Sequence, residues 1–247
     1  SRKIINLPSW DFSRDGKVWS QVAVPHDWAI AGPFDKKWDL QMVAIEQNGE
    51  KEKTEKSGRS GALPWIGEGM YKMNLQLPKG YKRAVLVFDG AMSQPVVKVN
   101  GKEAGRWAYG YNAFRIDITP YVHFGGKKNL VEVHLSNVEE SSRWYPGGGL
   151  YRPVSVELYG NENFSTWDTF VRTLKADKQE AEVEVNALLE GKIGKSGKTV
   201  IALLDEAGTK VAEQTISGAT PAIKTTLKVA NPQLWSPESP YLYQVKL

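Results

Sequence analysis

The sequence predicts an all-β protein made of two consecutive β-sandwiches. Short stretches in which apolar and polar residues alternate recur along most of the chain, and this period of two is typical of half-buried strands. Glycine, proline and asparagine stand between these stretches, where tight turns need them. No long stretch repeats its apolar residues with the period of a helix. Strands joined by turns therefore explain the pattern.

The first part of the chain predicts a jelly roll or a similar β-sandwich, because its strand candidates follow one another at short spacing. Asn100-Gly101 predicts a hairpin within one of these segments, since a two-residue turn needs positive φ at both positions. A single helical turn is expected within Thr119–Gly125. The strand candidates are Tyr71–Pro78, Ala84–Gly90, Pro95–Gly105, Ala113–Thr119, Asn129–Asn137 and Arg152–Gly160.

Residues Gln47–Gly61 interrupt this pattern with a polar and charged run that holds almost no apolar residue. Such a run predicts a solvated surface loop or the tip of a hairpin. A loop that binds a partner is the alternative.

A second set of alternating segments begins after Gly160 and predicts an immunoglobulin-like or fibronectin-like sandwich. Its strand candidates are Phe170–Ala176, Ala181–Gly191, Lys198–Gly208, Lys210–Gly218, Ile223–Val229 and Pro240–Leu247. Because the chain has no cysteine, this sandwich would lack a disulfide. The boundary near Gly160–Asn163 predicts a jelly-roll domain in residues 1–161 and an immunoglobulin-like domain in residues 162–247.

Composition and charge exclude several classes of protein. The 32 basic and 28 acidic residues leave a net charge of +4, and the lysines are scattered, so no nucleic-acid partner is expected. No apolar run approaches the roughly 20 residues of a membrane helix, so no membrane span is predicted. The absence of cysteine excludes thiolate nucleophiles and Cys-ligated zinc. These features do not decide the compartment, although a periplasmic or secreted location is favoured over a cytoplasmic one.

Several stretches of the chain carry motifs that occur together in one enzyme family. They are Trp19–Phe34, Leu63–Pro78, Val85–Thr119 and Ser136–Leu158, with a weaker match in Asn231–Leu247. Within them, the tract SSRWYPGGGLYR (residues 141–152) is the most specific. Together they resemble the amino-terminal part of family 2 glycoside hydrolases of the β-galactosidase type, and the resemblance covers nearly the whole chain.

The resemblance implies a galactose-binding-like jelly roll first, an immunoglobulin-like domain second and a (β/α)₈ barrel third, with both catalytic glutamates in the barrel. The chain stops at Leu247 on a strand pattern. We therefore expect the non-catalytic amino-terminal fragment of a hydrolase of terminal β-glycosides, with galactosides first and glucuronides or mannosides next. The expected partners are the carbohydrate substrate and the protein's own barrel. No cofactor is expected, and this segment alone is predicted to be inactive.

Residues 1–247 are predicted to contain no catalytic residue. Retaining hydrolysis needs two carboxylates about 5–5.5 Å apart, and neighbours such as Glu139 and Glu140 point to opposite faces of an extended chain. The His26-Asp27 pair lacks a Ser or Cys nucleophile beside it. We interpret this pair as a structural corner, in which Asp27 caps backbone amides and Trp28 packs inward.

Arg143, Trp144 and Tyr145 are predicted to form a substrate-side rim. They precede Pro146-Gly147-Gly148-Gly149, a run that helix and sheet both disfavour and that permits a tight loop. A planar cation, a ring face and a phenol suit sugar hydroxyls and pyranose faces. In the family, the corresponding loop reaches toward the active-site mouth of the barrel. The alternative is that both rings pack between domains while Arg143 pairs with a barrel carboxylate.

One departure from the family concerns metal binding. Some β-galactosidases of the family carry an acidic residue just before this tryptophan that helps to hold sodium and substrate. Here the neighbours are Ser141, Ser142 and Arg143, so no metal site is expected and the preference for galactosides is weakened.

The aromatic residues Trp107, Tyr109 and Tyr111 alternate and are expected to share one strand face. They could form a platform for a sugar, pack in the core, or lie under the following domain. The platform interpretation supports a stand-alone carbohydrate-binding module without hydrolase activity, which is the alternative to an enzyme fragment. A purely structural pair of sandwiches is the third hypothesis. Trp235 is expected to fill the second sandwich.

Overall fold

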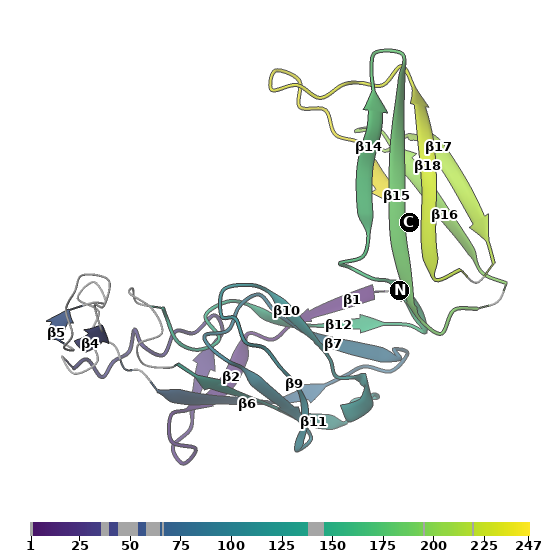
Figure 1. The fold of residues 1–247 in the computed structure, drawn as a ribbon. Helices are drawn as coiled ribbons and strands as arrows, with labels where there is room; N and C mark the ends of the chain where they lie inside the picture. Colours follow the sequence, from purple (N-terminus) through teal and green to yellow (C-terminus); the bar gives the residue numbers. More distant parts are fainter. Residues whose placement is uncertain are drawn as a thin grey trace. The chain divides into compact units, whose positions relative to one another are not determined.

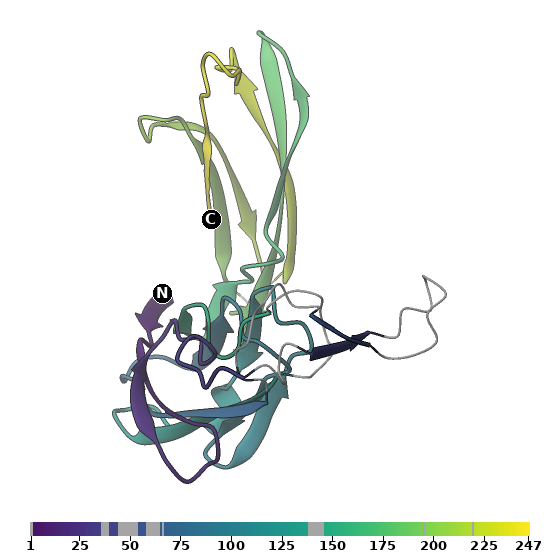
Figure 2. The ribbon, with the colours of Figure 1, turned by 90° about the vertical axis from the view of Figure 1, so that its left-hand side faces the viewer.

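The computed structural model describes residues 2–35, 40–43, 54–57, 65, 67–137, 146–194, 196–218 and 220–247. These residues divide into two compact units, Arg2–Tyr159 and Gly160–Leu247 (Figure 1). Both units are built from antiparallel strands, as a second view also shows (Figure 2). The predicted all-β class, a jelly-roll-type sandwich followed by an immunoglobulin-like sandwich, is confirmed.

The first unit is a sandwich of two sheets. Figure 1 shows β7, β10 and β12 in one layer and β6, β9 and β11 in the other. The four-stranded sheet has the order β1 (Arg2–Asn6), β12 (Val154–Tyr159), β7 (Arg83–Phe88), β10 (Phe114–Asp117). The six-stranded sheet has the order β3 (Ser20–Ala23), β2 (Ser9–Ser13), β6 (Glu68–Gln76), β11 (Lys128–Ser136), β8 (Val96–Val99), β9 (Lys102–Arg106).

Alternation along the strands places one face of each sheet in the core. In β11, Val131, Val133 and Leu135 are fully buried, while the residues between them reach the surface. The predicted hairpin lies between β8 and β9, where Asn100 and Gly101 have φ of +52° and +78°. The predicted helical turn is a 3₁₀ turn at Thr119–Tyr121. The inward residues of the two sheets form one continuous apolar core.

The polar run Gln47–Gly61 lies largely outside the described residues. Two short strands flank or enter it, β4 (Leu40–Val43) and β5 (Thr54–Ser57), and they pair antiparallel with each other.

A buried ion cluster joins three strands of the four-stranded sheet. Glu157 of β12 is only 4% exposed and binds Arg2 of β1, Arg115 of β10 and the Tyr159 hydroxyl. Burial alone would raise the pKa of Glu157. The hydrogen bonds from Arg115, Tyr159 and Arg2 outweigh burial and hold that pKa at about 2. The cluster therefore depends on a charged carboxylate.

The second unit also has two sheets. In the first, β15 (Glu180–Gly191) pairs with β13 (Glu162–Phe164), β14 (Phe170–Ala176) and β18 (Ala222–Ala230). In the second, β16 (Lys198–Leu204) lies between β17 (Lys210–Ser217) and β19 (Gln244–Lys246). Val185, Ile201 and Leu227 belong to its small core.

The prediction that Trp235 fills the second sandwich is wrong. Its side chain is 59% exposed. It lies at the edge of an apolar pocket of about 510 Å³, which Val183, Leu203 and Leu242 also line. Trp235 sits in the segment between β18 and β19, outside the regular alternation that directs strand side chains inward.

Candidate functional site

Several loops meet at one end of the first sandwich. Met92 and Gly149 exchange two backbone hydrogen bonds, of 2.9 and 2.8 Å. The Ser93 hydroxyl donates to the Ser136 carbonyl at 2.6 Å. The Tyr151 hydroxyl donates to the Gly110 carbonyl at 2.8 Å. These contacts join loops that are far apart in the sequence into one surface.

The predicted rim residues Arg143, Trp144 and Tyr145 lie outside the described residues. The chain on either side of them is described and well anchored. Asn137 is 4% exposed, and its backbone N–H donates to the Gly67 carbonyl at 2.9 Å. Its side-chain amide donates to the Gly147 carbonyl at 2.9 Å. The two flanks of the 138–145 segment are therefore tied to each other.

The His26-Asp27-Trp28 corner holds the carboxyl-terminal flank of that segment. The backbone N–H groups of His26 and Trp28 donate to the carbonyls of Leu150 and Gly148, at 2.7 and 3.0 Å. Asp27 Oδ1 accepts the backbone N–H groups of Ala29 and Gly148, at 3.0 and 3.2 Å. Asp27 thus caps backbone amides and Trp28 is fully buried, as the sequence predicted.

We call Phe12, His26, Trp28, Trp65 and Tyr71 the ring cluster. Trp28 lies nearly parallel to Phe12 and meets Trp65 edge-on, with centroids 5.7 and 5.8 Å away. The Tyr71 hydroxyl lies 2.7 Å from His26 Nδ1. Burial disfavours the charged form of both side chains. It therefore raises the pKa of Tyr71 and lowers the pKa of His26. The pair is therefore neutral and structural near pH 7.

Arg14 contacts two residues of the ring cluster, Trp28 and Trp65. Its guanidinium donates to the carbonyl oxygens of Trp28, at 3.0 Å, and Gly32. It also lies over the Trp65 ring, 4.9 Å from the centroid. Burial lowers the pKa of Arg14, but an arginine stays charged near neutral pH. This cation therefore serves to hold the corner.

Gly148 and Gly149 of the PGGG run are needed because the ring cluster packs directly against their backbone. A Cβ on Gly148 would lie 2.4 Å from Trp28 Nε1. On Gly149 it would lie 2.3 Å from the Tyr71 hydroxyl oxygen, and the φ of Gly149 is +110°. We call residues 26–28, Asn137 and 147–149 the loop frame. The sequence indicated a tight loop here, but no pattern in it identified Tyr71 or Asn137 as its partners.

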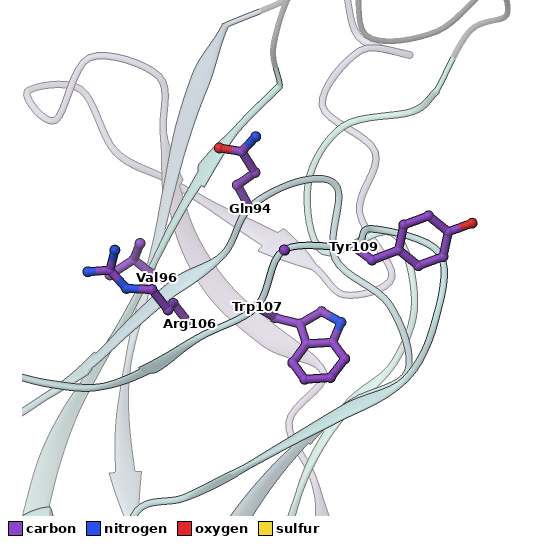
Figure 3. A pocket seen from close by; sticks show the side chains of 6 residues that line it. Gln94, Val96, Arg106, Trp107 and Tyr109 are labelled. Carbon is purple, nitrogen blue, oxygen red and sulfur yellow. The ribbon is translucent and has the colours of Figure 1, made fainter.

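A pocket of about 470 Å³ lies on the same unit beside Trp107 (Figure 3). The residues that line it are Gln94, Val96, Arg106, Trp107, Ala108 and Tyr109. The prediction that Trp107, Tyr109 and Tyr111 share a strand face is wrong, because β9 ends at Arg106 and the three rings lie in the following loop. Gly110, which is buried against Met92, lies in the middle of this loop.

Two of the described carboxylates contact neighbouring groups of the first sandwich. Asp117 accepts the Thr119 N–H at 2.9 Å, and Glu68 faces His134 at 3.3 Å. The neighbouring pair Glu139-Glu140 lies outside the described residues. Among the described residues, no three His, Asp or Glu side chains gather as they would around a metal ion. Within the same residues, no helix has the length and apolar character needed to span a bilayer.

Comparison with known proteins identifies related sequences. Residues 164–247 match the model of the glycosyl hydrolases family 2. A putative β-glucuronidase of Formosa agariphila is 32% identical over 244 residues, which are 96% of this chain and 22% of the relative. A β-galactosidase of Bacteroides ovatus is 32% identical over 235 residues, 91% of this chain and 26% of the relative. The chain thus spans about a quarter or less of the length of these relatives.

Solved structures give the same result. A glycosyl hydrolase family 2 member from Bacteroides cellulosilyticus superimposes with a TM-score of 0.76 and 30% identity, over 98% of this chain and 32% of that one. A β-glucuronidase of glycoside hydrolase family 2 superimposes with a TM-score of 0.79 over 99% of this chain and 28% of that one. Its identity is 22%, so it supports the fold alone.

Proposed function

Because the chain belongs to glycosyl hydrolase family 2, we propose that it is the non-catalytic amino-terminal part of a glycosidase that hydrolyses terminal β-glycosides. In this proposal a (β/α)₈ barrel beyond Leu247 supplies both catalytic glutamates. Residues 1–161 are a jelly-roll, sugar-binding-type domain and residues 162–247 are an immunoglobulin-like domain. Together they brace the barrel and shape its mouth. The partners are the β-glycoside substrate and the protein's own barrel.

The observation that carries the proposal is the loop frame. Asn137 and Gly147 are joined by a hydrogen bond, and the His26–Trp28 corner fixes the backbone of Gly148. A short segment with both ends fixed loses less conformational entropy when its side chains bind a ligand. We propose that Arg143, Trp144 and Tyr145 form the substrate-side rim on this frame. The alternative role, packing against a neighbouring domain, uses the same anchored segment.

The preferred sugar follows from two opposing considerations. The resemblance and the Bacteroides ovatus relative, named a β-galactosidase, favour a galactoside. The Formosa agariphila relative is named a putative β-glucuronidase, and the cation of Arg143 would suit a uronate carboxylate. We retain β-galactosides as the first substrate to test and β-glucuronides as the second.

The test compares chains of two lengths. Purified residues 1–247 and the longer protein encoded beyond Leu247 are assayed with p-nitrophenyl β-galactoside and β-glucuronide. We expect turnover by the longer protein only. Hydrolysis by a contaminant-free preparation of residues 1–247 would overturn the proposal, as would a longer protein inactive on both substrates.

The rim is tested by Trp144→Ala in the longer protein. If Trp144 positions substrate, kcat/KM should fall by about a hundredfold while the unfolding midpoint stays unchanged. A lower unfolding midpoint with an unaltered kcat/KM would instead support the packing role. Trp19→Ala is the matched control, since the Trp19 ring contacts Lys72, which is not part of the loop frame.

A further inference from the structure

The indole of Trp107 continues a stack of rings that begins in the core. Phe88 and Phe114 are fully buried and stack at 4.7 Å between centroids, with 5° between planes. Trp107 stacks on Phe114 at 5.5 Å and 8°, and it remains 36% exposed. Its Nε1–H donates to Asn112 Oδ1 at 2.8 Å. The ring orientation is therefore fixed before any ligand arrives.

The pocket beside this indole combines apolar surface with few polar groups. Val96, Ala108 and the indole supply apolar atoms, while Gln94, Arg106 and Tyr109 supply hydrogen-bonding groups. Figure 3 shows the Gln94 amide and the Arg106 guanidinium on different sides of the pocket, with Trp107 between Arg106 and Tyr109. The volume of about 470 Å³ falls within the range of small-ligand sites, roughly 300–1,000 Å³. This composition suits a pyranose, which has an apolar C–H face and a rim of hydroxyls.

The charges beside the pocket favour an uncharged ligand. Arg106 is the only charged residue among the described residues that line it. Its Nε and one Nη donate to the Glu103 carboxylate at 2.9 and 2.8 Å. An anionic ligand would have to compete with that carboxylate, whereas a hydroxyl can use the N–H groups that point elsewhere.

We propose that the Trp107 pocket binds a neutral hexopyranose residue of a glycan. The C–H face of the sugar lies against the exposed part of the indole, and its hydroxyls meet Gln94, Arg106 and Tyr109. The preorganised ring reduces the entropic cost of binding. This binding is separate from hydrolysis, because it uses neither the rim residues nor a catalytic carboxylate.

The experiment titrates residues 1–247 with methyl β-galactopyranoside, methyl β-glucopyranoside and methyl β-glucuronide, observed through the indole N–H resonances. We expect at least one neutral sugar to saturate with a Kd of about 1 mM and to shift the Trp107 indole signal. The glucuronide should bind more weakly than that sugar. Trp107→Ala should weaken binding about tenfold or more, and Trp107→Phe should weaken it less.

Two variants keep the test decisive. Trp167→Ala is the matched control, because Trp167 is 60% exposed and lies in the other unit; it should leave Kd unchanged. Tyr109→Ala replaces Trp107→Ala if the latter fails to fold, since Tyr109 is 58% exposed on the loop.

Three results would overturn the proposal. They are no saturation by either neutral sugar at roughly ten times the expected Kd, a Kd unaffected by the pocket variants, or tighter binding of the glucuronide. Hydrolysis by the longer protein is measured in a separate assay. Failure of sugar binding would therefore leave the proposed enzyme function intact, and failure of hydrolysis would leave the proposed sugar binding intact.

Discussion

Replacing Gly149 by alanine should destabilise the first unit strongly. The backbone of Gly149 has a φ of +110°, where a side chain costs roughly 1–3 kcal/mol. The new Cβ would also lie 2.3 Å from the Tyr71 hydroxyl oxygen and 2.7 Å from the His26 carbonyl oxygen. Relieving such an overlap costs roughly 1–3 kcal/mol, and this carbonyl belongs to backbone that cannot rotate away. Together we expect about 2–6 kcal/mol, a large part of the ~5–15 kcal/mol that stabilises a typical domain.

Gly80→Ala is the matched control for this change. The φ of Gly80 is +92°, but no atom lies within 4 Å of the Cβ that would be added. This variant therefore carries the backbone strain without the overlap, and it should cost only about 1–2 kcal/mol. The difference between the two variants measures the packing of the ring cluster against the loop frame.

The assay is urea unfolding observed through the indole N–H resonances. Trp28 reports the first unit and Trp167 the second, so the two transitions are separated. The Trp28 transition should move to lower urea in Gly149→Ala, while the Trp167 transition stays in place. If Gly149→Ala were no more destabilising than Gly80→Ala, the close approach at Gly149 would not contribute to the free energy of unfolding. The argument for a rigid loop frame would then fail.

Three further predictions concern buried polar groups of the first unit. Tyr71→Phe removes the hydroxyl that faces His26 Nδ1, and it should lower the free energy of unfolding by about 1–2 kcal/mol, measured by urea denaturation. Glu157→Gln leaves two arginines without their carboxylate and should cost roughly 3–5 kcal/mol, whereas Glu103→Gln at an exposed pair should cost less than about 1 kcal/mol. The pKa of Glu157 is about 2 in the folded chain against an ordinary 4.5, so its stabilisation is complete above pH 4.5 and is lost as the pH falls toward 2. The thermal midpoint should therefore drop across that range, and Glu157→Gln should flatten the drop; an equal drop in both proteins would refute the assignment.

The regular strands could be predicted from the sequence because each carries its own pattern. Strand β14 was predicted with its observed bounds, Phe170–Ala176, and the hairpin at Asn100-Gly101 follows from local backbone chemistry. Strands β1 and β13 were missed because they are only five and three residues long, too short to show a clear alternation. Local pattern is therefore sufficient where a strand is long enough for its alternation to be recognised.

The candidate sites depend on contacts that no local pattern encodes. Tyr71 contacts His26, which lies 45 residues away in the sequence. The Asn137 side chain donates to the Gly147 carbonyl, 10 residues away. The Trp107 loop was mistaken for a strand because its rings happen to alternate, and β9 in fact ends one residue earlier. In a loop, the spacing of side chains along the sequence does not fix the direction in which they point. Only the folded structure therefore distinguishes an alternating loop from a strand.

The loop frame also explains why the tract of residues 141–152 needs two of its glycines. Gly148 and Gly149 contribute no side-chain chemistry, yet both face buried rings at distances that exclude a Cβ. The hydrogen bond between the Asn137 side chain and the Gly147 carbonyl ties together the two flanks of the 138–145 segment. Binding residues are commonly carried on loops that a rigid scaffold positions, and the loop frame is such a scaffold. The close packing of Gly148 and Gly149 therefore accounts for the two glycines, and under the proposed function the loop frame would hold Arg143, Trp144 and Tyr145 beside the substrate.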